Sequence, residues 1–210
     1  MPEFTVRELS PVLLGDWLSF FDHDAFADNP DWAGCYCHFF HADHDQKPFD
    51  ERTARENRTA SSALIAAGRL KGYLAYADGK PVGWCQAAPR LQIPNMEKDE
   101  SLQVGDAGRV GSIVCFAVAQ PYRHLGVAGR LLEAACSGFR AQDMTIAEAY
   151  PRLHVDSDAA NYHGPLRLYL DAGFTVFREL ERLAIVRKDL SSGGDDQRVA
   201  VDNGHPRGSA

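Results

Sequence analysis

The feature that most constrains this chain is an apolar segment that leads directly into an amphipathic helical pattern. Residues 112–118 predict a strand, and residues 124–141 predict a helix with apolar side chains at helical spacing. The turn between them reads Arg-x-x-Gly-x-Ala, beginning at Arg123. The first N–H groups of a helix lack partners inside the helix, and the helix dipole makes this end partly positive. Because Gly126 and Gly129 let an anion approach closely, the junction predicts a phosphate-binding site.

Two other interpretations of the junction were weighed. Small residues also allow a helix to pack closely on a sheet, with no ligand involved. A dinucleotide-binding fold would require Gly-x-Gly-x-x-Gly followed by an acidic residue. The first glycine of that pattern is missing here, so we discount the dinucleotide interpretation.

Two motifs together resemble a known family. The segment from Arg123 to Leu132 resembles the pyrophosphate-binding motif of the GNAT N-acetyltransferase superfamily. The segment from Tyr169 to Phe174 is similar to the Tyr-x-x-x-Gly-Phe signature that closes the acetyl-CoA site in that superfamily. The resemblance covers roughly residues 3 to 190 and is closest from residue 72 onward.

The order of expected elements suits this family. Helices are expected near 11–22 and 50–67, then a hairpin that turns at Asp78-Gly79. The resemblance implies an α/β fold with a mixed, mostly antiparallel sheet, flanked by helices. Its two central parallel strands, 112–118 and 145–150, would splay apart and leave a gap for the pantetheine arm of the cofactor. The segment 89–109 holds prolines and many polar groups, and is expected to be a surface loop.

The chain is long enough for one sizeable core and leaves little room for two. We expect one acetyltransferase domain over residues 1–190, with a long N-terminal helical part over about 1–70. Residues 191–210 are rich in Gly, Ser and Asp, and predict a disordered tail.

The resemblance implies a set of cofactor-binding residues. Backbone groups at the end of the first splayed strand would pair with the pantetheine amides, and the helix start would hold the diphosphate of acetyl-CoA. Asn161 lies one position away from an asparagine that many members carry, where this chain has Tyr162. The expected cofactor-binding residues are Phe116, Val118, Arg123, His124, Leu125, Gly126, Val127, Ala128, Gly129 and Asn161.

The resemblance also implies the transfer chemistry, in which a substrate amine attacks the thioester directly. The Tyr169 hydroxyl would protonate the departing thiolate, although an aromatic residue at helical spacing is also a common core residue. The amine must lose a proton before it attacks. Glu148, on the second splayed strand, is the first candidate base, with His154, Asp156 and His163 as neighbours in sequence.

A cluster of cysteine and histidine residues lies near the N-terminus: Cys35, Cys37, His38, His41 and His44. Thiolate and imidazole ligands suit Zn²⁺, and a zinc-stabilised interaction protein is one interpretation. However, Cys-x-Cys is not the usual ligand spacing, and no second cysteine pair follows. We therefore expect no metal, and favour a cluster that shapes the acceptor pocket together with Trp32, Tyr36, Phe39 and Phe40.

Net charge and hydropathy limit the classes of partner and the location expected for this chain. The net charge of −7 lacks the basic surplus that nucleic-acid binding usually requires, and mildly favours cationic substrates such as amines. No apolar run approaches the length of a membrane span, and the first residues lack a signal pattern, so the expected location is cytoplasmic. The five cysteines are expected to be free thiols. A homodimer is compatible with the sequence.

These observations predict an acyltransferase that moves an acetyl group from acetyl-CoA to a primary amine of a small molecule. The alternative is a regulatory or interaction module that binds CoA and catalyses no reaction. The sequence alone does not identify the acceptor.

Overall fold

The computed structural model describes residues 2–155, 157 and 161–191. The strands are β1 (Phe4–Glu8), β2 (Gly72–Ala77), β3 (Lys80–Pro89), β4 (Val110–Val118), β5 (Ile146–Ala149), β6 (Thr175–Glu179) and β7 (Ala184–Asp189). The α-helices are α1 (Leu14–His23), α2 (Ala54–Ala66), α3 (Pro94–Lys98), α4 (Val127–Ala141) and α5 (Leu166–Asp171). None of the helices in this described part of the chain is long and apolar enough to cross a membrane.

The seven strands form one sheet in the order β1-β2-β3-β4-β5-β7-β6. Adjacent strands pair antiparallel, except that β4 and β5 pair parallel. These two strands pair only over Val110–Ile113 and Ile146–Ala149. β4 then continues to Val118 while β5 ends, so the two strands part in the middle of the sheet. The predicted α/β fold with two splayed parallel central strands is confirmed.

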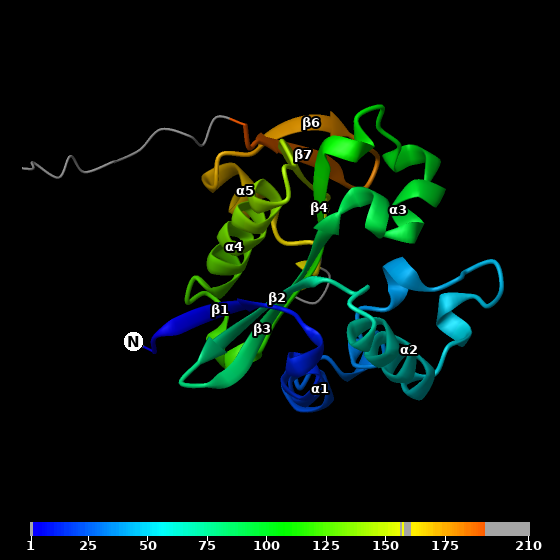
Figure 1. Ribbon diagram of the computed structural model, residues 1–210, viewed down its shortest axis with the longest axis vertical. Helices are drawn as coiled ribbons and strands as arrows, with labels where there is room; N and C mark the ends of the chain where they lie inside the picture. The colour runs from blue at the N-terminus through cyan, green and yellow to red at the C-terminus, as the bar shows by residue number, and fades with distance from the viewer. Residues whose placement is uncertain (1, 156, 158–160, 192–210) are drawn as a thin grey trace, which may run out of the picture.

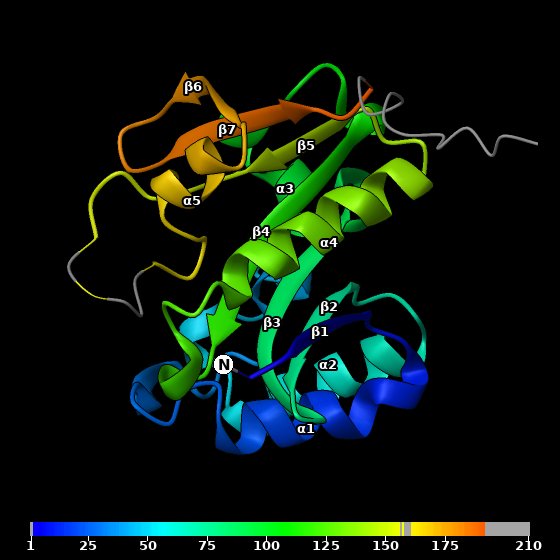
Figure 2. The same ribbon diagram turned by 90° about the vertical axis from the view of Figure 1, so that its left-hand side faces the viewer.

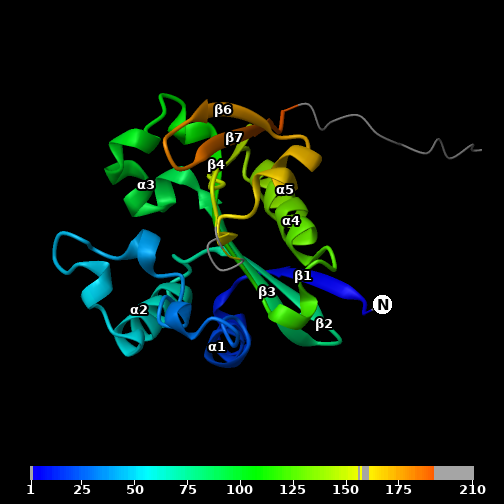
Figure 3. The same ribbon diagram turned by 180° about the vertical axis from the view of Figure 1, so that it is seen from behind.

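Helices cover both faces of the sheet. α4 and α5 lie on one face, and α1, α2 and α3 lie on the other (Figures 1 and 3). Figure 2 shows α4 running across the face of β3 and β4. Close approach of this helix requires glycines on the strands, because a Cβ at Gly111 would overlap the ring of Phe139, and one at Gly83 would lie 2.8 Å from Val127.

The opposite face is packed mainly with aromatic side chains. Trp17 and Phe21 of α1 are buried against Trp84 of β3, with ring centroids 6.1 and 6.4 Å away. α2 starts with a capping box, in which Thr53 and Glu56 each accept a hydrogen bond from the other's backbone N–H. α2 contributes Asn57 to the lining of one of the cavities described below.

Local sequence signals agree with several element boundaries. Asp78 and Gly79 both have positive φ, 49° and 81°, as a tight hairpin turn requires. Gly68, with φ of 66°, follows the end of α2 as predicted. The first expected helix begins with a 3-10 turn over Pro11–Leu13 and continues as α1.

Three features differ from the predictions. β1 was not predicted, because its short alternating pattern becomes a strand only when β2 supplies an antiparallel partner. The expected loop 89–109 contains α3 and several 3-10 turns, which a buried arginine holds in place. α4 starts at Val127, after a turn, and not at 124. The predicted tail, from residue 192 onward, lies outside the described residues.

Candidate active site

The junction between β4 and α4 has the predicted strand, turn and helix. β4 ends at Val118, a 3-10 turn follows over Gln120–Tyr122, and α4 starts at Val127. Gly126 caps the helix with a φ of 83°, which glycine adopts without strain. The N–H of Arg130 donates to the Gly126 carbonyl at 3.2 Å. The N–H groups of the turn before Arg130 have no acceptor inside the helix and point out of its end.

A cavity of about 470 Å³ opens beside this helix start, and we call it the β4–α4 cavity. Its walls come from the end of β4, the first turn of α4 and the segment before α5. Leu125 is absent from the lining, and its side chain is 45% exposed. The structure brings the other residues predicted to bind a cofactor around this one cavity: Phe116, Val118, Arg123, His124, Gly126, Val127, Ala128, Gly129 and Asn161.

The gap between the splayed strands is bridged by the segment before α5. The Phe116 N–H donates to the Tyr162 carbonyl at 2.5 Å, and Nδ1 of His163 contacts the Val114 carbonyl at 2.8 Å. A carbonyl only accepts, so Nδ1 carries the proton in this contact. Burial lowers the pKa of His163 to about 4, which leaves the ring neutral at pH 7. The donor predicted to hold the pantetheine is therefore bonded to Tyr162 in this structure.

Arg123 stands at the side of the same cavity. Its guanidinium makes two contacts with Asp28, at 2.6 and 2.9 Å, and its Nε donates to the Val118 carbonyl at 3.1 Å. The hydrogen bonds from Arg123 lower the pKa of Asp28. These contacts fix the turn against the N-terminal part of the chain.

Tyr169 lies directly behind the wall of the β4–α4 cavity. It is fully buried, and its hydroxyl donates to the His163 carbonyl at 2.5 Å. Burial raises the pKa of this hydroxyl well above its ordinary value, so the group stays protonated. A Cβ placed on Gly164, which lines the cavity, would lie 3.0 Å from the hydroxyl oxygen. The hydroxyl therefore lies next to Gly164, one of the residues that line the cavity.

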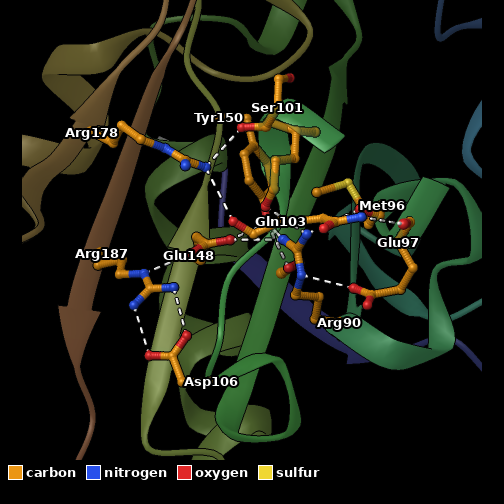
Figure 4. Close-up of polar contacts among 12 residues, drawn as sticks. Arg90, Met96, Glu97, Ser101, Gln103, Asp106, Glu148, Tyr150, Arg178 and Arg187 are labelled. Carbon is orange, nitrogen blue, oxygen red and sulfur yellow. Dashed lines mark hydrogen bonds and ion pairs between the residues drawn. The ribbon is translucent and has the colours of Figure 1, made fainter. Parts of the chain in front are cut away.

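Glu148 lies elsewhere, in a buried ionic network (Figure 4). Its Oε1 accepts from Arg90 at 2.9 Å and from the Tyr150 hydroxyl at 2.6 Å, and its Oε2 accepts from Arg187 at 2.6 Å. Figure 4 shows the two arginines approaching the carboxylate from opposite sides. Glu148 lines neither of the two cavities described here. Because both of its oxygens are occupied, this environment favours a structural role over the predicted role as a base.

Arg90 is the centre of that network. It is fully buried and uses all five N–H donors, two of them on the carbonyls of Met96 and Leu102. Arg187 adds a two-pronged contact with Asp106, at 2.8 and 2.9 Å. The network thus ties the 90–109 segment to β5 and β7, which explains why that segment is ordered and not an open loop.

A second cavity, of about 520 Å³, lies on the side of the sheet that carries α1 and α2. We call it the aromatic cavity, because ring side chains make up much of its lining: Phe26, Trp32, Phe39, Phe40, Phe49 and Tyr162. Phe26 and Tyr162 line both cavities. Cys115 lines the aromatic cavity and the next residue of β4, Phe116, lines the β4–α4 cavity. Because successive residues of a strand face opposite sides, the two cavities lie on either side of β4 here, and they adjoin where Phe26 and Tyr162 line both.

The cysteine and histidine cluster contributes to the aromatic cavity through Cys35 and Cys37. Cys37 accepts from the Trp84 indole N–H at 3.1 Å, and its Sγ lies 3.4 Å from that of Cys115. Burial raises the pKa of Cys35 to about 12 and that of Cys37 well above its ordinary value, so both thiols stay protonated. Among the described residues, no three His, Cys, Asp or Glu side chains come together as a metal site. Of the aromatic residues expected beside this cluster, Trp32, Phe39 and Phe40 line the cavity and Tyr36 does not.

Two candidate bases from the sequence remain, His154 and Asp156. The side chain of His154 is exposed and lines neither cavity. Asp156 lies outside the described residues.

A family model described as the Acetyltransferase (GNAT) family matches residues 29–174, which is more than half of the chain. The chain belongs to the GNAT acetyltransferase family. It is therefore an acyltransferase, as the sequence predicted. No curated protein matches the sequence significantly.

Solved structures share the fold at low identity. An N-acetyltransferase from Staphylococcus aureus Mu50 has a TM-score of 0.54 and 14% identity, covering 90% of this chain and 99% of that one. A GNAT-family acetyltransferase from Streptococcus pneumoniae has a TM-score of 0.51 and 16% identity, covering 89% and 99%. The PaiA N-acetyltransferase of Thermoplasma acidophilum, in complex with coenzyme A, has a TM-score of 0.53 and 14% identity, covering 89% and 99%. At these identities the likeness establishes the fold.

Sequence reasoning missed three residues that the structure makes prominent. Arg90 gave no signal, because its partners Glu148 and Tyr150 are distant in sequence. Tyr162 was noticed only as a departure from the family pattern. Gln86 carried a usable signal, since it is a lone amide in the otherwise apolar strand Val82–Ala88.

Proposed function

We propose that this GNAT protein transfers an acetyl group from acetyl-CoA to a primary amine of a small molecule, by direct attack of the amine on the thioester. The observation that carries the proposal is that two cavities adjoin beside β4, where Phe26 and Tyr162 line both. One cavity borders a helix start suited to a diphosphate, and the other is lined by rings and closed enough to hold a small molecule. Reactants bound in the two cavities would therefore meet beside β4.

The residues at the start of α4 fit the diphosphate of acetyl-CoA. Their free N–H groups point out of the helix end, and the helix dipole adds to the attraction. Space around Gly126 and Gly129 is open, since a Cβ at either would meet nothing within 4 Å. The coenzyme A bound by the Thermoplasma acidophilum neighbour supports the choice of cosubstrate.

The backbone of β4 would position the acyl group. The Phe116 N–H, close to Tyr162 in the wall that both cavities share, would polarise the acyl carbonyl as an oxyanion donor does. In the free protein this N–H donates to Tyr162. Cosubstrate binding on this path therefore requires the Tyr162 carbonyl to move away from β4.

The chemical step joins the amine nitrogen to the carbonyl carbon and breaks the carbon–sulfur bond. Acetyl-CoA supplies the activated acyl group, and Tyr169 would give its proton to the departing thiolate. Its raised pKa keeps the hydroxyl protonated, and a Cβ on Gly164, which lines the cavity, would lie 3.0 Å from the hydroxyl oxygen. After the attack, the nitrogen of the adduct loses one further proton, and this proton restores the neutral hydroxyl of Tyr169.

Proton removal from the amine is assigned to no side chain. Glu148 is held between two arginines, and the neutral ring of His163 is a weak base because its pKa is near 4. We therefore infer that the amine enters in its free-base form, with water taking its proton beforehand. The rate at limiting amine should then rise with pH up to the pKa of the amine itself.

The diphosphate site is tested by a matched pair of substitutions, Gly126→Asp and Gly126→Asn. Both side chains tolerate a positive φ and have nearly the same shape, so they differ mainly in charge. We expect Gly126→Asp to bind CoA at least tenfold more weakly than Gly126→Asn in calorimetry, because the carboxylate repels the diphosphate at short range. Equal affinities of the two variants would move the diphosphate elsewhere.

The role of Tyr169 is tested by Tyr169→Phe, which removes only the hydroxyl. We expect kcat to fall about tenfold to a hundredfold while the Kd for acetyl-CoA changes little, because the acid acts mainly in the transition state. Tyr73→Phe removes another buried hydroxyl, packed between the sheet and α4, and serves as the control. An unchanged kcat in Tyr169→Phe would remove the acid role.

The alternative function, a module that binds CoA without turnover, predicts a different result. Such a module would bind acetyl-CoA and release no thiol with any amine of a broad panel. Thiol release that depends on both acetyl-CoA and an amine would exclude it.

A further inference from the structure

Several buried polar atoms lack a hydrogen-bond partner among the described residues, and Gln86 is the described residue with two of them. Gln86 of β3 is 1% exposed, and neither Oε1 nor Nε2 has a hydrogen-bond partner among the described residues. Buried polar groups in folded proteins are nearly always hydrogen-bonded, and each exception requires an explanation. A carboxamide has two donor hydrogens and an acceptor oxygen, so both the donors and the acceptor of Gln86 lack partners among the described residues.

Gln86 lies in the wall of the aromatic cavity. On the sheet it is paired with Cys115, which lines the same cavity and precedes Phe116. The pairing of β3 with β4 shifts directly after Gln86, so the strand is irregular at this position. Partners for the carboxamide must therefore come from whatever occupies the cavity, close to the proposed site of transfer.

The rest of the lining indicates the body of that occupant. Ring side chains such as Trp32 and Phe40 offer flat apolar surfaces, which suit an aromatic or large apolar group. The thiols of Cys35 and Cys37 stay protonated and add apolar surface.

Charged side chains of both signs also line the cavity. Asp31 and Asp50 are exposed, and neither has an ion pair with another described residue, so they can attract an ammonium group. Arg52 donates to Asn57 at 2.8 Å, and Arg152 donates to the Tyr162 hydroxyl at 2.9 Å. The two carboxylates and two guanidiniums balance, so the lining sets no net charge for the occupant. Polar recognition then depends on the neutral amide of Gln86.

We propose that Gln86 selects the acceptor, which is a primary amine with an aromatic body and an amide-like group offering a donor and an acceptor side by side. This inference rests on the proposed function for the transfer step. The carboxamide of Gln86 would form a paired set of hydrogen bonds with the amide-like group, which leaves the amine directed toward Phe116. An acceptor that lacks this group leaves the buried carboxamide unmet and binds more weakly.

Three amines that share a phenyl ring test the proposal. Phenylalaninamide offers a donor and an acceptor, phenylalanine methyl ester offers an acceptor only, and 2-phenylethylamine offers neither. Binding of each to the CoA-loaded protein is measured by calorimetry, and kcat/KM is measured by thiol release. We expect the wild-type protein to prefer phenylalaninamide over 2-phenylethylamine by at least tenfold, with the ester between them.

Gln86→Met replaces the amide with an apolar side chain of similar length. We expect it to lose at least tenfold in affinity for phenylalaninamide and less than twofold for 2-phenylethylamine. Gln142→Met, at the end of α4 where Gln142 donates to the Gly138 carbonyl, is the matched control and should keep the wild-type order. Gln86→Leu serves as the second variant, and the comparison of the three amines on the wild-type protein needs no variant.

The outcomes separate this inference from the proposed function. Equal binding of the three amines, an equal loss for all three in Gln86→Met, or no binding of any would overturn the role of Gln86, even if amines are acetylated. Binding of phenylalaninamide that depends on Gln86, without any thiol release, would support the role of Gln86 and overturn the transfer.

Discussion

Gln86 and Arg90 lie close together in sequence, at the end of β3 and just after it, and both are buried. Arg90 uses all five of its N–H donors, and the carboxamide of Gln86 uses none among the described residues. The contrast separates two uses of a buried polar group. A group whose bonds are all met within the chain fixes structure, whereas one left unmet beside a cavity can be met by a ligand.

The energies support this division. Removing one partner from a buried ion pair leaves an uncompensated charge and is strongly destabilising. Removing a buried group that has no partner in the chain costs the fold little, because no hydrogen bond is lost. Stability measurements on the two residues should therefore give opposite results. Each residue is replaced by methionine in a separate variant, so that the two changes in the free energy of unfolding can be compared directly.

The largest effect is expected for Arg90→Met. The change leaves Glu148 with one guanidinium in place of two and frees the carbonyls of Met96 and Leu102. We expect the free energy of unfolding to fall by about 3–5 kcal/mol in urea denaturation. Arg167→Met breaks only the exposed contact with Asp171, and should produce no measurable change. A loss for Arg90→Met below about 1 kcal/mol would contradict the structural role of the network.

The second prediction concerns the loss of stability in acid. The buried histidines and the ionic network around Arg90 should lose their contributions to stability in different pH ranges. Burial lowers the pKa of His38 and His163 to about 4, from 6.5. Between these values the unfolded chain binds more protons than the folded protein, so stability falls as the pH is lowered from 6.5 to 4. Hydrogen bonds from Arg187 lower the pKa of Asp106 below 3.8, so its contribution is present above pH 3.8 and is lost only in stronger acid.

The measurement is urea denaturation between pH 7 and pH 4. His163→Asn keeps a donor for the Val114 carbonyl and removes the titrating ring. It should reduce the slope of stability against pH by up to about 1.4 kcal/mol per pH unit. His154→Asn changes an exposed side chain and should keep the wild-type slope. An unchanged slope in His163→Asn would contradict the buried, neutral state of that ring.

The smallest effect on stability is expected for Gln86→Met. Because no described residue bonds to the carboxamide, the free energy of unfolding should stay unchanged or rise by about 1 kcal/mol. The same urea experiment as for Arg90→Met provides the measurement. A loss above about 1 kcal/mol would mean that Gln86 has partners within the fold, and the contrast between the two residues would disappear.

Much of the fold was open to prediction because its signals are local. The Asp78-Gly79 turn and the Gly68 helix end depend on φ values that these residues favour in any context. The order of the central strands and of α4 and α5 followed from hydrophobic periodicity together with the family resemblance. β1 escaped prediction because its pairing with β2 crosses a large part of the chain.

The residues of the candidate site also differ in whether local sequence signals could predict them. The residues from Arg123 to Gly129 adjoin one another in sequence, so a single motif predicted most of the lining of the β4–α4 cavity. Glu148 was predicted as a base from its strand position alone. Its actual environment depends on Arg90 and Arg187, which come from a distant segment and another strand. No local pattern reports such a partner.

The sequence by itself determined the strand–turn–helix junction and the chemistry that a helix start offers to an anion, because backbone geometry there depends on neighbouring residues. Tertiary structure alone decided which buried polar groups find partners. Hydrogen bonds reach only about 3 Å, and chain folding sets which side chains come within that distance. The difference between Gln86 and Arg90 is therefore visible only in the folded protein.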